Sequence, residues 1–90
     1  MSYSISLSDK ATKQLKKLNK AVVRRIIDKL KTLSSEPYSK TLPLQDSEFR
    51  RLRIGDWRII LDIADDLKEV FVVLVGKREN IYEELEQSGG

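Results

Sequence analysis

The second half of the sequence constrains the fold most, because three strand-like segments follow one another with almost no chain between them. The segments are 49–54, 57–64 and 67–75, and two residues separate each segment from the next. Connections of this length favour tight antiparallel hairpins. Positions 70–75 are all apolar, which is typical of a central strand that is buried on both faces. The sequence therefore predicts a small antiparallel sheet.

The first half predicts one strand and a pair of helices. Tyr3, Ile5 and Leu7 alternate with serines, as in a half-buried strand. Ser8 is a suitable N-cap for a first helix. A second helix is expected over about residues 20–34, because its apolar side chains recur at the spacing of a core-facing stripe. These side chains are Val22, Val23, Ile26, Ile27, Leu30 and Leu33.

The remaining segments complete the predicted topology. Residues 34–47 contain both prolines and are expected to form a loop. A short terminal helix is predicted because Asn80 and Glu83 have the spacing of a capping box. We therefore expect a single α+β domain over residues 1–90, with the order β-α-α-β-β-β-α. The helical hairpin should cover one face of the sheet, and the other face should be open or only partly covered.

The composition excludes several classes of chemistry. The sequence has no cysteine and no histidine, so disulfides, thiol nucleophiles and histidine-based acid–base or metal chemistry are excluded. The carboxylates form no ligand pattern, and neither a metal nor a cofactor is expected. No apolar run approaches the roughly 20 residues that span a bilayer. The first residues also lack the basic and apolar regions of a signal peptide, so a cytoplasmic protein is expected.

Charge is distributed unevenly along the chain. Residues 1–46 carry ten Lys or Arg against four Asp or Glu, whereas residues 47–90 carry seven against ten. The basic half is a candidate surface for nucleic acid or for an acidic protein partner. The alternative is a solvated helix face with no partner.

An arginine cluster on the predicted sheet is the strongest functional signal. Arg51 and Arg53 should share the face opposite Leu52, about 7 Å apart given the strand rise of about 3.3 Å per residue. Arg58 on the next strand and Arg78 after the third strand should extend the same cluster. Guanidinium groups suit phosphate because they offer a fixed fork of donors and remain charged. The alternative is a neutral network with the nearby acidic residues Glu48, Asp62, Glu69 and Glu79.

Tyr82 follows Arg78 by four residues, so its ring could lie over the same face. A base stacked on such a ring gains roughly 1–3 kcal/mol. Alternatively, Tyr82 packs the terminal helix on the sheet.

These residues carry a resemblance to a known family. The segment 49–63, FRRLRIGDWRIILDI, is similar to the central strand pair of the RelE/ParE toxin superfamily. The segment 75–79, VGKRE, followed shortly by Ile81 and Tyr82, resembles the end of the RelE branch. The resemblance extends over essentially the whole chain, including the first strand and the helical hairpin.

The resemblance implies a toxin of a type II toxin–antitoxin system that enters the ribosomal A site and cleaves messenger RNA. In such an enzyme the 2′-hydroxyl attacks the adjacent phosphate without a metal, leaving a 2′,3′-cyclic product. The catalytic roles would fall on five residues: Arg51, Arg53, Arg58, Arg78 and Tyr82. Arg58 would stabilise the phosphorane, Arg78 would neutralise or protonate the leaving 5′-oxygen, and Tyr82 would stack on or orient the nucleotide.

The resemblance also implies macromolecular partners. Lys13, Lys17, Arg24 and Lys77 would contact RNA or the ribosome through phosphates. A cognate antitoxin, RelB-like, acidic and helical, would hold the toxin inactive by wrapping around it.

One departure from the family pattern affects the chemistry. The family often has lysines where this chain has Arg51 and Arg53, and one of those lysines is regarded as the general base. Arginine, with a pKa of about 12.5–13.8, is a poorer base than lysine by roughly 3 kcal/mol or more. Lys77, Glu79 or Tyr82 could take the proton instead, the ribosome could supply a group, or no base is needed.

Two other functions are compatible with the same residues. A ParE-like toxin would inhibit DNA gyrase by protein binding, and the arginines would then be incidental. A catalytically weakened family member would bind RNA without cutting it.

Overall fold

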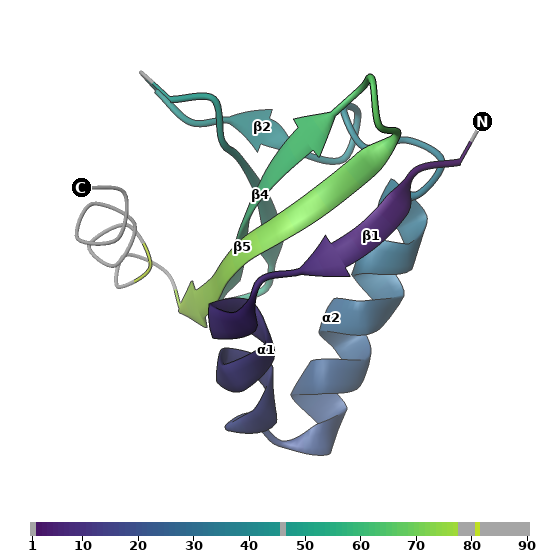
Figure 1. The fold of residues 1–90 in the computed structure, drawn as a ribbon. Helices are drawn as coiled ribbons and strands as arrows, with labels where there is room; N and C mark the ends of the chain where they lie inside the picture. The colour runs from purple at the N-terminus through teal and green to yellow at the C-terminus, as the bar shows by residue number, and fades with distance from the viewer. Residues whose placement is uncertain (1, 46, 78–80, 82–90) are drawn as a thin grey trace.

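The computed structural model describes residues 2–45, 47–77 and 81 of the 90-residue chain. Two helices follow the first strand, and four further strands follow the helices (Figure 1). The elements are β1 (Ser4–Leu7), α1 (Asp9–Lys16), α2 (Lys20–Leu33), β2 (Leu42–Pro43), β3 (Arg50–Ile54), β4 (Trp57–Ala64) and β5 (Glu69–Lys77). The predicted α+β class and the N-terminal helical hairpin are confirmed. The predicted terminal helix and its Asn80 cap lie outside the described residues.

The sheet is mixed, not antiparallel as the sequence predicts. Its five strands have the order β1-β5-β4-β3-β2, and β1 pairs with β5 in parallel, with Ile5 opposite Val70. Hairpin connections fix only the directions of consecutive strands. The direction of β1 depends on a contact more than 60 residues away in sequence, which local periodicity does not report. β5 is interior as expected, because it has a neighbour on each side. The predicted burial on both faces is wrong, because Phe71, on the face away from the helices, is 39% exposed.

The two hairpin turns differ from one another. Gly55 and Asp56 form the expected two-residue turn between β3 and β4, and Gly55 has a φ of +58°. A positive φ at the first central position is typical of a type II′ turn, which suits the twist of a hairpin. The β4–β5 connection is longer than predicted, at residues 65–68, and Lys68 adopts a φ of 51°. The third strand therefore starts at Glu69 rather than at residue 67.

Short polar side chains begin both helices. The hydroxyl of Ser8 accepts a hydrogen bond from the Ala11 N–H at 3.0 Å, and the Asn19 side chain accepts one from the Val22 N–H at 2.9 Å. These bonds satisfy N–H groups that have no partner within a helix. The cap at Ser8 is as predicted, and Asn19 separates the two helices into a hairpin.

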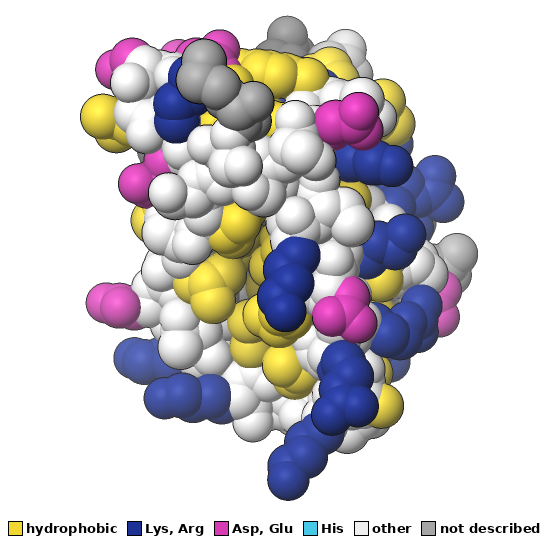
Figure 2. Space-filling view, turned by 90° about the vertical axis from the view of Figure 1, so that its right-hand side faces the viewer, with side chains coloured by type: hydrophobic (Ala, Val, Ile, Leu, Met, Phe, Trp, Pro, Cys, Tyr) yellow, Lys and Arg dark blue, Asp and Glu magenta, His cyan; other side chains and the backbone are white. Residues whose placement is uncertain are grey.

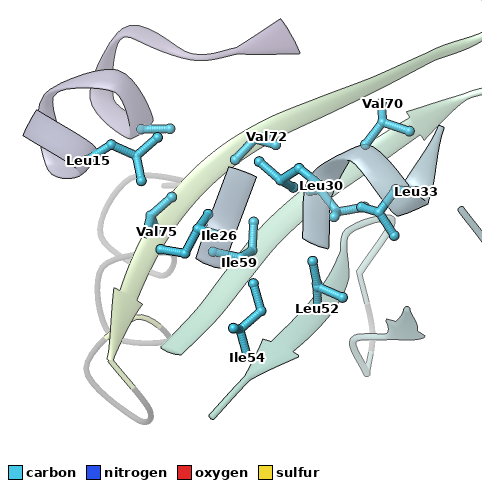
Figure 3. Close-up of a cluster of buried hydrophobic side chains, with 12 residues drawn as sticks. Leu15, Ile26, Leu30, Leu33, Leu52, Ile54, Ile59, Val70, Val72 and Val75 are labelled. Atoms are coloured by element: carbon cyan, nitrogen blue, oxygen red, sulfur yellow. The ribbon is translucent and has the colours of Figure 1, made fainter. Parts of the chain in front are cut away.

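The main core lies between the helices and one face of the sheet (Figure 3). The apolar stripe of α2 faces alternate residues of the strands, as the period-2 and helical patterns require. The buried members are Ala11, Leu15, Ile26, Leu30, Leu33, Leu52, Ile54, Ile59, Leu61, Val70, Val72 and Val75. A smaller cluster on the other face contains Ile60, Leu74 and Ile81, with Leu44, Phe49 and Val73 packed against it. The second face is therefore partly covered.

The proline-containing connector is anchored to the sheet. Its residues Leu42 and Pro43 pair with Arg51 and Arg50 as the short edge strand β2, which the sequence does not predict. Thr41 is 4% exposed, and its hydroxyl donates to the Pro37 carbonyl at 2.7 Å. The same hydroxyl accepts from Arg50 Nε at 2.8 Å. These contacts fix the connector beside β3.

Candidate nucleic-acid interface

Strand register brings three of the predicted arginines together. Arg53 lies directly opposite Arg58 in the β3–β4 pair, and Arg51 lies opposite Ile60. Leu52 and the other core-facing residues of these strands point toward the helices. Because alternate residues of a strand point to opposite faces, Arg51, Arg53 and Arg58 share the face away from the helices. We call these three residues the arginine face.

Arg58 is the most constrained member of the arginine face. Its side chain is 9% exposed, and Nη1 donates to the carbonyl of Gly55 at 2.7 Å and to that of Trp57 at 3.0 Å. Arg53 is exposed and Arg51 is half-buried. One guanidinium is thus fixed by the backbone of its own hairpin, while a second guanidinium stands opposite it in solvent.

Two acidic residues of the alternative, a neutral network, lie far from Arg58 along their strands. Glu69 lies at the start of β5 and accepts a hydrogen bond from Ser6 at 2.9 Å. Arg58 pairs with Gly76 at the other end of that strand, about 23 Å away at 3.3 Å per residue. Asp62 is on the same face as Arg58 but four residues along β4, a separation of about 13 Å. Glu79 lies outside the described residues.

Gly76 and Ile81 lie close together beside Arg58. Gly76 lies opposite Arg58, and a Cβ at Gly76 would be 3.3 Å from the Ile81 Cβ. Ile81 is fully buried against Ile60 and Leu74. The sequence places Ile81 in the family-like ending but does not mark it as a site residue, although a glycine at the end of an apolar strand is a signal of close approach. Arg78 and Tyr82, the other predicted site residues, lie outside the described residues.

The predicted RNA-binding residues Lys13, in α1, and Lys17, its C-cap, lie near the end of β5. Lys13 and Lys17 line an open pocket with Lys10, Gln14, Leu18 and Val75. The Gln14 side chain accepts from the Val75 N–H at 2.7 Å, at a position beyond the last β1 pair on that strand. This bond holds α1, and therefore its lysines, against the end of β5.

Arg24 lies instead in a groove between the two helices. The groove has a volume of about 720 Å³ and an apolar floor with a charged rim. Figure 2 shows a strip of apolar side chains with Lys and Arg side chains beside it. The lining residues are Thr12, Leu15, Lys16, Leu18, Lys20, Val23, Arg24, Ile27, Asp28 and Lys31.

Lys77 is separated from the arginine face. Its Nζ lies 5.3 Å from the centroid of the Trp57 ring, within the range of a cation–π contact. Trp57 packs against the main core on the helix side of the sheet. Lys77 is therefore on the opposite side of the sheet from Arg58.

A tyrosine–aspartate cluster at the other end of the sheet was not predicted. Asp65 accepts hydrogen bonds from Tyr3 at 2.9 Å and from Tyr38 at 2.7 Å. These bonds hold the pKa of Asp65 below its ordinary value, and the Tyr38 bond raises the pKa of that phenol to about 12. The cluster joins the β4–β5 turn to the N-terminus and the connector.

Two findings limit the chemistry of the part of the chain that the structure describes. It contains no group of three or more His, Cys, Asp or Glu side chains placed to hold a metal ion. Over the same residues, no helix is long and apolar enough to cross a membrane.

The arginine face and the basic helices define a small basic α+β protein suited to a polyanionic partner. The sequence profile of the family described as "ParE toxin of type II toxin-antitoxin system, parDE" matches residues 5–82. The chain belongs to the RelE/ParE superfamily of type II toxin–antitoxin toxins.

Individual relatives support the same assignment. A RelE-like toxin protein of Escherichia coli is 30% identical over 82 residues, covering 88% of this chain and 86% of the relative. The mRNA interferase toxin RelE of E. coli K12 is 29% identical with the same coverage. The toxin–antitoxin complex RelBE2 of Mycobacterium tuberculosis contains a chain with a TM-score of 0.81 and 23% identity. The match covers 87% of this chain and all of that chain, which supports the fold.

Proposed function

We propose that this toxin is a ribosome-dependent endoribonuclease that cleaves messenger RNA in the A site without a metal. The observation that carries the proposal is the arginine face, in which Arg58 and Arg53 stand directly opposite each other. Like charges in this position destabilise a sheet. An anionic ligand between the two guanidiniums relieves that repulsion. The similarity to an mRNA interferase favours RNA as the ligand.

The reaction transfers a phosphoryl group within the RNA strand. The 2′-oxygen forms a bond to the adjacent phosphorus, the bond to the 5′-oxygen breaks, and the products are a 2′,3′-cyclic phosphate and a 5′-hydroxyl. Arg58 stabilises the extra negative charge of the phosphorane, and Arg51 and Arg53 hold the neighbouring phosphates. Arg78 neutralises the negative charge on the leaving 5′-oxygen or donates a proton to it, giving the 5′-hydroxyl, and Tyr82 stacks on or orients the nucleotide.

The proton of the 2′-hydroxyl needs an acceptor other than the arginines, because their pKa of about 12.5–13.8 keeps them charged. Lys77 contacts Trp57 on the opposite side of the sheet, which argues against it as the base. The remaining acceptors are Glu79, Tyr82 and a group of the ribosome, or water if no general base takes part. Electrostatic stabilisation and in-line positioning supply most of the acceleration in any of these cases.

The test is cleavage of a defined message on ribosomes with an open A site. We expect cleavage by the wild-type protein and a loss on the order of 10²-fold for Arg58→Ala, the size typical for removal of one transition-state donor. Arg78→Ala should weaken cleavage as well. Lys40→Ala is a matched control, since Lys40 is exposed in the connector. Intact message in the presence of folded wild-type protein contradicts the proposal.

The name of the matching profile favours one alternative, inhibition of DNA gyrase by a ParE-like toxin. The two functions can be distinguished by testing whether cells that express the Arg58→Ala variant stop growing. A ribonuclease loses toxicity with this substitution, whereas a gyrase inhibitor that does not use the arginine face keeps it. Continued growth with the wild-type chain indicates the third possibility, a member that binds RNA without cutting it.

We further propose that a RelB-like antitoxin, acidic and helical, binds this chain. Related toxins crystallised in complexes with RelB antitoxins support the proposal. The groove between α1 and α2 offers an apolar floor and a basic rim, which suit an acidic amphipathic helix. Lys20→Glu combined with Lys31→Glu should weaken the complex with the cognate antitoxin. Unchanged affinity would exclude this groove as the contact surface.

A further inference from the structure

We infer that Gly55 is a positioning residue for Arg58, and that its left-handed backbone fixes the guanidinium of the arginine face. The inference deepens the proposed function, since it explains how Arg58 is held ready for a phosphate. Gly55 touches no proposed substrate atom itself. It acts through the carbonyl that accepts from Arg58 Nη1 at 2.7 Å.

The direction of that carbonyl depends on the turn type. Gly55 has a φ of +58°, which residues with a Cβ adopt only at a cost and β-branched residues adopt least. A turn with a negative φ at this position rotates the peptide plane that carries the Gly55 carbonyl. Nη1 of Arg58 then loses its shorter hydrogen bond and keeps only the bond of 3.0 Å to its neighbour Trp57.

The helix side of the turn is also occupied. A Cβ at Gly55 would lie 3.2 Å from Nη2 of Arg25, which belongs to α2. The Arg25 guanidinium therefore packs on the turn from the helix side, while Arg58 binds the turn from the opposite face of the sheet. With 9% exposure, Arg58 has little freedom to reorient in this position. The turn sets the direction of the guanidinium before any RNA binds.

Two substitutions separate backbone conformation from the bulk of an added side chain. Gly55→Asn and Gly55→Val both place a side chain against Arg25, but of the two only asparagine is common at the positive-φ positions of hairpin turns. We expect Gly55→Asn to keep the cleavage rate at saturating ribosomes within a few-fold. Gly55→Val should lower that rate on the order of 10²-fold, the effect of a misplacement of about 1 Å in a catalytic group.

The control is a valine substitution at the other positive-φ position, in the β4–β5 hairpin. Lys68 has a φ of 51° in the β4–β5 turn, far from Arg58 in the strand register. Lys68→Val should lower the midpoint of thermal unfolding as Gly55→Val does, but leave the cleavage rate unchanged. Equal rates for the Gly55→Val and Lys68→Val variants would overturn the inference.

A measurement on the wild-type protein tests the inference without relying on cleavage or on the folding of a variant. In NMR spectra, the Nη protons of Arg58 should exchange with water and rotate more slowly than those of exposed Arg53. Gly55→Val should remove this difference and Gly55→Asn should retain it. Equally fast exchange of the two arginines in the wild type would contradict the positioning role. Slow Arg58 exchange without cleavage would instead contradict only the ribonuclease proposal.

Discussion

Replacing Arg53 by Gln should make the free protein more stable while making it a poorer ligand for phosphate. Arg53 is exposed and directly opposite Arg58, where Cβ atoms are about 4.5–5.5 Å apart. For two guanidinium charges about 7 Å apart, the repulsion in water is about 0.6 kcal/mol. A Debye length of about 10 Å at 0.1 M salt reduces this to about 0.3 kcal/mol, and 1 M salt removes most of it.

Arg58→Gln should have the opposite effect on stability. The substitution removes the same repulsion, but it also removes the charged donor that binds the carbonyls of Gly55 and Trp57. Hydrogen bonds to charged groups contribute about 1.5–3 kcal/mol. We therefore expect a net loss of about 2 kcal/mol. The two variants thus distinguish Arg53, whose charge serves binding alone, from Arg58, whose charge also stabilises the hairpin.

The assay is urea unfolding at low and high salt, with Lys40→Gln as the control for loss of one positive charge. Arg53→Gln should raise the free energy of unfolding by about 0.3–0.6 kcal/mol at low salt, and the gain should vanish near 1 M salt. The control should show no comparable salt-dependent gain. A loss of stability in Arg53→Gln, or a gain that persists in high salt, would contradict a destabilising repulsion between Arg53 and Arg58.

Two further predictions concern the segments that frame the sheet. Thr41→Val keeps the side-chain volume but removes the hydroxyl that binds the Pro37 carbonyl and Arg50 Nε. Urea unfolding should therefore show a free energy of unfolding lower by about 2 kcal/mol. An unchanged free energy of unfolding would show that water replaces the hydroxyl. The hydrogen bonds from Tyr38 and Tyr3 lower the pKa of Asp65 in the folded protein. The ionised carboxylate therefore stabilises the fold at pH values above the pKa of Asp65 in the unfolded chain. This stabilisation is lost as the pH falls through the lower pKa of the folded state. Asp65→Asn should therefore flatten the acid limb of the stability curve, and should return the pKa of Tyr38 from about 12 toward 10.0 in a phenolate titration. An unchanged acid limb would indicate that other carboxylates control it.

Much of the local structure could be predicted from the sequence, because short-range physics controls it. The alternation of Leu52 and Arg53 assigns one side chain to the core and the other to the opposite face. The cap at Ser8 depends on residues within one helical turn. Gly55 at a two-residue connection predicts the β3–β4 hairpin, and with it the register that sets Arg53 opposite Arg58. The shared face of the three arginines follows from these local patterns.

Other features depend on contacts between distant parts of the chain, and only the tertiary structure shows them. The parallel pairing of β1 with β5 joins residues more than 60 positions apart, and periodicity is the same for either strand direction. The burial of Arg58 depends on which carbonyls of its hairpin its guanidinium reaches. Lys77 contacts Trp57 on the helix side of the sheet, so it lies on the face opposite the arginine face. A sequence specifies which side chains share a strand face, but long-range packing determines which of them lie close enough to act together.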